Sequence, residues 1–125
     1  AYILIEGGKT SAVEYMSNTR AIPRDKKDIA VSTAVAGELL GMRLTYLEAG
    51  SGAQLPVPTE TIQAVRNKLD MPLIVGGGIS TPEAMLSAFE AGADLVVIGN
   101  AFESQPQLIP DFAEALKKYN EKEEI

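Results

Sequence analysis

Two stretches of the sequence combine residue types that could bind a phosphorylated substrate and act on it. The first, YLEAGSG at residues 46–52, places Tyr46 and Glu48 two positions apart, before a turn rich in glycine. Side chains two apart in a β-strand point to the same side, so both would face one site. A carboxylate there could take a proton from a substrate hydroxyl, and the Tyr hydroxyl could orient the same substrate.

The second stretch is LIVGGGIS at residues 73–80, in which Gly76, Gly77 and Gly78 follow an apolar run. Gly99 and Asn100 end the next apolar run in the same way. Backbone N–H groups that no side chain obstructs can hold a phosphate. One glycine pair is better explained by a tight turn, but two clusters after consecutive strands favour a phosphate site. The contiguous glycines do not fit the dinucleotide-binding pattern G-x-G-x-x-G.

The composition limits the chemistry that these residues can perform. The chain has 125 residues, which predicts a single domain over residues 1–125, and a net charge of -6 without a basic cluster. Nucleic acid and anionic membranes are therefore not expected as partners. The absence of cysteine and histidine excludes disulfides, thiolate metal sites and a Ser-His-Asp triad. Catalysis must use carboxylates, Tyr, Lys, hydroxyls, backbone dipoles or a metal held by oxygen ligands.

Strands and helices alternate around the two stretches. The predicted strands cover residues 2–6, 44–50, 72–77 and 94–100, and each is apolar and ends in glycine or another turn residue. The predicted helices begin at an N-cap Asp28, at residue 59, at a Ser80–Glu83 capping box and at residue 109. Gly41 should stop the first of these helices, a turn of helix is possible at residues 11–16, and residues 120–125 should be frayed.

Strands that are apolar throughout indicate a parallel sheet covered by helices. Their spacing is close to the roughly 30 residues per βα unit of an eight-fold barrel, and four units make half of one. In such barrels the loops after the last two strands commonly bind phosphate. A self-contained, doubly wound sheet is the structural alternative.

The motifs YLEAGSGA, PLIVGGGIS and AGADLVVIGN, with IPRDKKDIA upstream, resemble the C-terminal half of geranylgeranylglyceryl phosphate synthases and of bacterial heptaprenylglyceryl phosphate synthases. The resemblance covers essentially the whole chain, and YLEAGSG is its most specific motif. It implies the C-terminal (β/α)4 half of a modified TIM (β/α)8 barrel. It also implies a cytoplasmic, Mg2+-dependent enzyme of ether-lipid biosynthesis. That enzyme moves a polyprenyl group, expected to be geranylgeranyl, from its diphosphate to the C3 hydroxyl of sn-glycerol 1-phosphate.

The resemblance also implies roles for individual residues. Glu48 would be the catalytic base, and Gly77, Gly78, Gly99 and Asn100 would hold the phosphate. The full set of implied substrate-binding positions is Tyr46, Leu47, Glu48, Ala49, Gly50, Ser51, Gly52, Gly76, Gly77, Gly78, Gly99 and Asn100. No metal ligand is expected in this chain, because the family's Mg2+ and diphosphate residues lie on strands that have no counterpart here. The Mg2+ ligands are expected in a missing N-terminal half, and activity of these residues alone is not expected.

Two alternatives stay open. Half of another phosphate-binding barrel, from tryptophan, histidine or thiamine biosynthesis, would share the glycine clusters but would not predict YLEAGSG. A non-catalytic half-barrel would associate through its edge strands, residues 2–6 and 96–98. In either case we expect a homo-oligomer or a pairing with the missing half-barrel.

Overall fold

Four parallel strands lie side by side in chain order in the computed structural model, which describes residues 1–124. Every neighbouring pair is parallel, as the sequence predicted, and Tyr2, Tyr46, Ile74 and Leu95 stand opposite one another across the sheet. The arrangement is that of half a (β/α)8 barrel, with β1 and β4 at its edges and an isolated bridge between Ile5 and Ile22 beyond the end of β1. The strands are β1 (Tyr2–Leu4), β2 (Thr45–Glu48), β3 (Leu73–Gly76) and β4 (Leu95–Val97).

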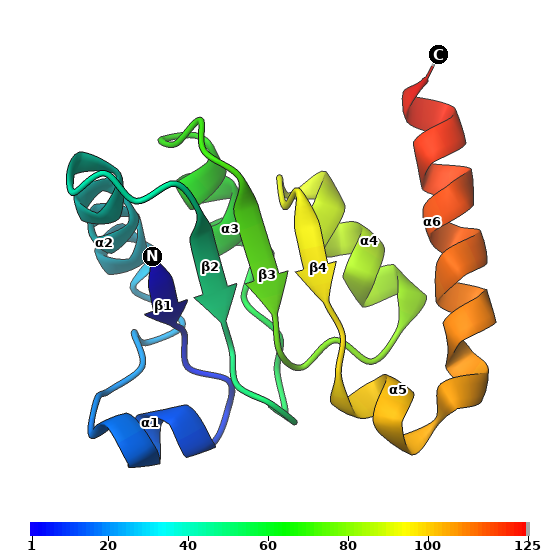
Figure 1. The fold of residues 1–125 in the computed structure, drawn as a ribbon, viewed down its shortest axis with the longest axis horizontal. Coiled ribbons are helices and arrows are strands. Elements are labelled where there is room, and N and C mark those ends of the chain that lie inside the picture. Colours follow the sequence, from blue (N-terminus) through cyan, green and yellow to red (C-terminus); the bar gives the residue numbers. More distant parts are fainter. Residues whose placement is uncertain (125) are drawn as a thin grey trace.

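Helices cover only one face of this sheet. Figure 1 shows α2, α3 and α4 behind the strands, with α6 beside α4, whereas α1 and α5 lie at the end to which the arrowheads point. No helix within the described residues is both long enough and apolar enough to cross a membrane. The helices are α1 (Ala12–Ser17), α2 (Lys27–Leu39), α3 (Thr59–Arg66), α4 (Pro82–Glu90), α5 (Asn100–Ser104) and α6 (Ile109–Glu123), with a 3-10 turn at Pro106–Leu108.

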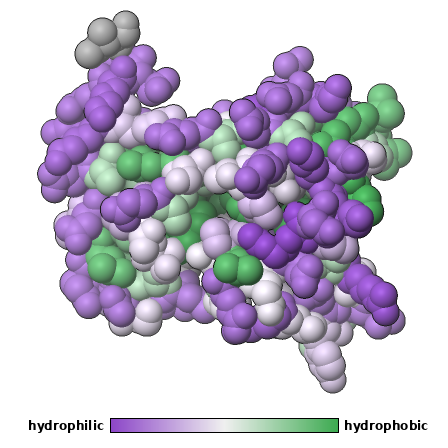
Figure 2. Space-filling view, turned by 180° about the vertical axis from the view of Figure 1, so that it is seen from behind, coloured by the Kyte–Doolittle hydropathy of each residue, from purple (hydrophilic) through white to green (hydrophobic). Residues whose placement is uncertain are grey.

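Strand alternation decides which residues form the core. Ile3, Leu47 and Val75 point toward the helices and are buried. The opposite face of the sheet is open, and there Tyr2 and Leu95 are 55% and 57% exposed. The helix-covered side is mostly hydrophilic at its surface (Figure 2). The sheet therefore buries one face against helices and leaves the other, which would face the interior of a barrel, without a cover.

Two predicted helix starts are wrong by one or two residues. The helix α2 begins at Lys27 after Lys26, so Asp28 lies in its first turn and is not the N-cap. Thr81, not Ser80, caps α4, and its side chain accepts a hydrogen bond from the N–H of Ala84. The physical reason is the proline that follows Thr81, because a residue before proline favours the extended backbone of an N-cap. The capping box expected between Ser80 and Glu83 does not form.

A capping box does form at α1, where the sequence was interpreted only as a possible turn of helix. Ser11 accepts from the N–H of Glu14, and the Glu14 carboxylate accepts from the N–H of Ser11. At the other end of the chain, the expected fraying of residues 120–123 is wrong, because α6 continues to Glu123 through Lys and Glu residues that favour helix. Ile125, the last residue of that prediction, lies outside the described residues.

Candidate functional site

A cleft of about 340 Å³ opens at the carboxyl ends of the strands. This is the end at which open α/β sheets bind ligands. The loops after β2, β3 and β4 form most of it, and α1 and the open sheet face supply the rest. Its lining residues are Tyr2, Val13, Tyr46, Glu48, Ser51, Gly52, Ala53, Gln54, Gly77, Gly78, Ile79, Ser80, Val97, Ile98, Gly99, Asn100, Ala101 and Ser104.

Glu48 and Tyr46 both face this cleft from the end of β2, as the alternation predicted. Only 9% of Glu48 is exposed, and its Oε1 accepts a hydrogen bond of 2.8 Å from the N–H of Gly50. Burial, together with hydrogen bonding to Glu48 and the charge of that carboxylate, raises the pKa of Tyr46. These groups favour the protonated phenol, whose hydroxyl lies beside the Glu48 carboxylate at the cleft. The ring of Tyr2, 5.2 Å away between centroids, packs against that of Tyr46.

The glycine run after β3 is required by close approach of neighbouring groups. A Cβ at Gly76 would lie 2.5 Å from the Tyr46 hydroxyl oxygen. A Cβ at Gly77 would lie 2.6 Å from Glu48 Oε1, and the backbone at Gly77 has a φ of +87° that other residues rarely adopt. The glycines therefore let the loop pass directly over the carboxylate, and they leave main-chain groups bare at the cleft.

The loop after β4 contacts the loop after β2 across this glycine run. The Ser51 hydroxyl donates to Asn100 Oδ1 over 2.9 Å, although the two residues are 49 positions apart. A Cβ built at Gly99 would have nothing within 4 Å, so the space beside it is open. Three successive loops thus surround the same small volume.

The structure divides the predicted binding residues into two groups. Tyr46, Glu48, Ser51, Gly52, Gly77, Gly78, Gly99 and Asn100 line the cleft. Leu47 and Ala49 do not, because strand alternation turns them into the hydrophobic core beneath the helices. Gly50 and Gly76 are buried. The N–H of Gly50 donates to the Glu48 carboxylate, and the missing side chain of Gly76 leaves room for the Tyr46 hydroxyl. Glu6, the other carboxylate near a strand end, is exposed and does not line the cleft.

Val13 reaches the cleft from the segment in which the sequence predicted only a possible turn of helix. It belongs to α1, and the Glu14 carboxylate holds that helix in place by accepting from the N–H of Ser11 at 2.7 Å and of Ala21 at 2.8 Å. The Ser11–Glu14 spacing was the signal that could have located α1. The sequence also did not indicate Gln54 and Ser80, which lie in loops, or Ala101 and Ser104, which lie in α5.

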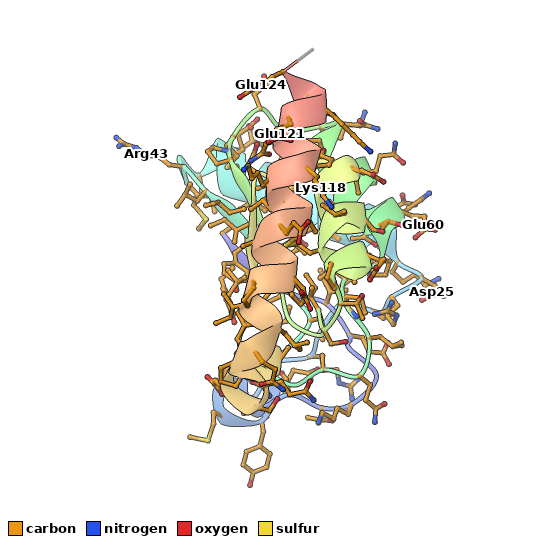
Figure 3. All side chains as sticks on the ribbon, turned by 90° about the vertical axis from the view of Figure 1, so that its right-hand side faces the viewer. Asp25, Arg43, Glu60, Lys118, Glu121 and Glu124 are labelled. Atoms are coloured by element: carbon orange, nitrogen blue, oxygen red, sulfur yellow. The ribbon has the colours of Figure 1, made fainter. Side chains whose placement is uncertain are left out.

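The cleft has no cationic lining among the described residues. The guanidinium of Arg24 donates to the carbonyl oxygens of Glu6 and Pro56. Other charged side chains, such as Arg43, Glu60 and Glu121, extend from the outside of the molecule (Figure 3). Within residues 1–124 no three carboxylates come close enough to hold a metal ion. The donors that an anion could meet in the cleft are main-chain N–H groups, hydroxyls and amides, and Glu48 is the one carboxylate among the described lining residues.

Comparison with known proteins gives one consistent result. The sequence profile of the PcrB family matches residues 1–117. A geranylgeranylglyceryl phosphate synthase of Spirosoma linguale is 45% identical over 96% of the chain and 48% of its own length. One from Thermococcus gammatolerans is 55% identical over 82% of the chain and 40% of its own length. The chain spans about half the length of the curated relatives it matches.

A solved structure agrees with the sequence relatives. The (S)-3-O-geranylgeranylglyceryl phosphate synthase of Thermoplasma acidophilum, in complex with sn-glycerol-1-phosphate, superposes with a TM-score of 0.85 at 38% identity. The match covers 94% of this chain and 48% of that one.

Proposed function

The chain belongs to the PcrB family, and from this premise we propose that it forms the acceptor-binding half of a glycerol-phosphate prenyltransferase. One observation carries the proposal. In a single cleft, the Glu48 carboxylate, fixed by a hydrogen bond, lies beside a glycine loop whose main chain no side chain covers. The related Thermoplasma acidophilum structure, which contains sn-glycerol-1-phosphate, supports the choice of acceptor.

In this proposal the phosphate of sn-glycerol 1-phosphate lies against the glycine loops. Main-chain N–H groups near Gly77, Gly78 and Gly99, with the Asn100 amide, supply the donors. Glycerol phosphate is small enough to place its far hydroxyl beside Glu48 and Tyr46 when its phosphate is held there. The absence of Lys and Arg from the lining makes the site depend on main-chain donors.

The chemistry proposed for Glu48 is general-base catalysis. The C3 hydroxyl oxygen forms a bond to C1 of the prenyl group as the bond from C1 to the diphosphate oxygen breaks. The hydroxyl proton goes to the Glu48 carboxylate, and the Tyr46 hydroxyl, which lines the same cleft, orients the acceptor. Diphosphate is the leaving group, and geranylgeranyl diphosphate is the expected donor.

The residues of this chain do not fit a Mg2+ site, because no carboxylate cluster is present in residues 1–124. We propose that the ligands for Mg2+ come from a second half-barrel that also closes the sheet. That half belongs to the same polypeptide or to a second copy, and the closed assembly is called the complete enzyme below. A cytoplasmic location is part of the same proposal.

Calorimetry and a transfer assay test the proposal together. Titration of sn-glycerol 1-phosphate, its 3-phosphate enantiomer and inorganic phosphate should show preferential binding of the 1-phosphate to the complete enzyme. Transfer from labelled prenyl diphosphates should then form an ether-linked product in the presence of Mg2+. The proposal would be refuted if the complete enzyme bound a sugar phosphate more tightly than glycerol 1-phosphate and formed no ether product.

A further inference from the structure

The hydrogen bond between Ser51 and Asn100 closes one wall of the candidate phosphate site. It joins the loop after β2 to the first residue of α5, which follows β4, and the glycine loop after β3 lies between them. The Ser51 hydroxyl is the donor and Asn100 Oδ1 is the acceptor, at 2.9 Å. Both residues line the cleft, so this bond belongs to its wall.

This hydrogen bond fixes the orientation of the Asn100 amide, because it holds Oδ1 against the Ser51 hydroxyl. A primary amide has an acceptor oxygen on one side and two N–H donors on the other. Because Oδ1 is held by Ser51, the position of Nδ2, the other arm of the planar amide, is fixed as well. There it stands over Gly52, at which a Cβ would be only 2.6 Å from Nδ2. A glycine with φ of +66° at position 52 therefore leaves the space that the amide occupies.

An anion distinguishes sharply between the two ends of an amide. A phosphate oxygen accepts hydrogen bonds, so Nδ2 is attractive to it and Oδ1 is repulsive. With no Lys or Arg lining the cleft, each neutral donor matters more to phosphate binding. An Asn100 amide that could rotate freely would present oxygen to the anion for part of the time.

We infer that Ser51 is a positioning residue that orients the Asn100 amide with Nδ2 toward the phosphate. Its hydroxyl hydrogen is used on Asn100 Oδ1 and is not donated to the ligand. The inference rests on the proposed function, since it names the same cleft as a phosphate site. It assigns different tasks to two residues that the sequence placed together in one binding set.

A double-mutant cycle in the complete enzyme tests this assignment. Ser51→Ala, Asn100→Ala and the double variant are compared by the Kd and KM for glycerol 1-phosphate and by kcat. We expect each single variant to raise Kd and KM by about tenfold with kcat nearly unchanged. The double variant should be no worse than Asn100→Ala, because Ser51 then has no amide to orient. Losses that multiply in the double variant would overturn the inference and make Ser51 a direct ligand.

Two further variants make the test independent of general damage to the fold. Ser51→Thr keeps the hydroxyl and should restore most of the affinity. Asn100→Asp keeps the acceptor for Ser51 but replaces Nδ2 by a carboxylate oxygen, so it should weaken binding more than Asn100→Ala does. Equal losses for Asp and Ala would contradict the need for an amide donor. Ser87→Ala serves as the matched control, since Ser87 lies on α4 outside the cleft lining and bonds only to Glu83 in its own helix.

Inorganic phosphate separates this inference from the proposed function. The orientation of Asn100 acts on the phosphate group itself, so the same pattern of variants should appear with inorganic phosphate as the probe. If the wild type bound phosphate but not glycerol 1-phosphate, the proposed function would fail while the cycle could still be measured. Unchanged phosphate affinity in Ser51→Ala and Asn100→Ala would refute the inference alone.

Discussion

At the scale of single residues, the Glu48 side chain is held in a fixed position and still faces the cleft, where a substrate could reach it. Its Oε1 is held by the N–H of Gly50, and the side chain is almost completely buried, yet it lines the cleft. The Gly77 backbone passes so close that only glycine fits beside the carboxylate. A base needs such a fixed position to meet a substrate hydroxyl at hydrogen-bonding distance.

Replacing Glu48 by Gln should remove the base and keep the size of the side chain. In the complete enzyme we expect kcat to fall by about 10²–10⁴-fold, the usual range for the loss of general-base catalysis, with a smaller effect on acceptor binding. Steady-state prenyl transfer to glycerol 1-phosphate measures both. Glu6→Gln is the control, because Glu6 is exposed outside the cleft. A near-normal kcat for Glu48→Gln with loss of activity in Glu6→Gln would reverse the assignment.

Replacing Gly77 by Ala should block the site. The added Cβ would stand 2.6 Å from Glu48 Oε1 and from the Gly50 carbonyl oxygen, so the loop must shift away from the carboxylate. We expect the Kd for glycerol 1-phosphate, measured by calorimetry, to rise by about tenfold or more.

The matched control for that variant is Gly41→Ala. Gly41 has a similar φ of +85°, but a Cβ there would meet nothing within 4 Å. Both variants incur the left-handed strain of roughly 1–2 kcal/mol, and only Gly77→Ala should lose affinity. Equal affinities in the two variants would show that close approach at Gly77 does not matter to the ligand.

At the scale of elements, the short helix α1 depends on one carboxylate. No residue of α1 is buried, so packing contributes little to its stability. Glu14 instead ties the helix to the chain on both sides, through the N–H groups of Ser11 and Ala21. These backbone hydrogen bonds, that from Ser11 first, lower the pKa of Glu14. The placement of Val13 at the cleft therefore rests on a charged, half-buried group.

Acidification should release α1 before the rest of the fold. A carboxyl whose pKa is lowered by folding stabilises the native state above its unfolded pKa, and that stabilisation is lost as the pH falls through the lowered native value. Amide resonances of Ser11 and Ala21 should titrate together in NMR spectra, with a midpoint below the ordinary Glu range. Separate midpoints for the two amides would contradict a shared carboxylate.

The substitution Glu14→Gln should loosen α1 at neutral pH. Glutamine has a single acceptor oxygen, so it can keep one of the two backbone hydrogen bonds and must lose the other. Amide hydrogen exchange in Ala12–Ser17 should become faster. Glu83→Gln is the control, because Glu83 lies in the first turn of α4 without a capping box. Equal effects on α1 and α4 would attribute the change to charge alone.

At the scale of the whole molecule, the sheet is open in two ways. The edge strands β1 and β4 have backbone groups without a strand partner, and the face opposite the helices carries exposed apolar side chains. Unprotected edges of this kind favour association with another strand. We therefore expect the half-barrel to pair with a second half, from its own polypeptide or from another copy.

The chain by itself should associate in solution. Analytical ultracentrifugation should give a mass above the 13.3 kDa of one chain at micromolar concentration. Leu95→Lys places a charge on the exposed face of the edge strand β4 and should shift the equilibrium toward monomer. Ile109→Lys is the control, since Ile109 is 46% exposed but begins α6, away from the sheet. A monomer at every concentration would refute the prediction.

Much of the architecture could be predicted because it depends on local patterns. Apolar strands separated by helical segments predicted a parallel sheet, and alternation placed Tyr46 and Glu48 on one side. The same alternation, applied strictly, would have assigned Leu47 to the core. The end of α2 just before Gly41 could also be predicted, because glycine accommodates the left-handed backbone there.

Contacts between residues far apart in sequence were decided only by the tertiary structure. The bond from Ser51 to Asn100 spans 49 positions, and the passage of Gly77 over Glu48 depends on how two loops meet. Strand and helix periods are properties of a single segment, so a sequence displays them directly. Distances between loops are properties of the assembled sheet. They are defined only once neighbouring strands have paired in register.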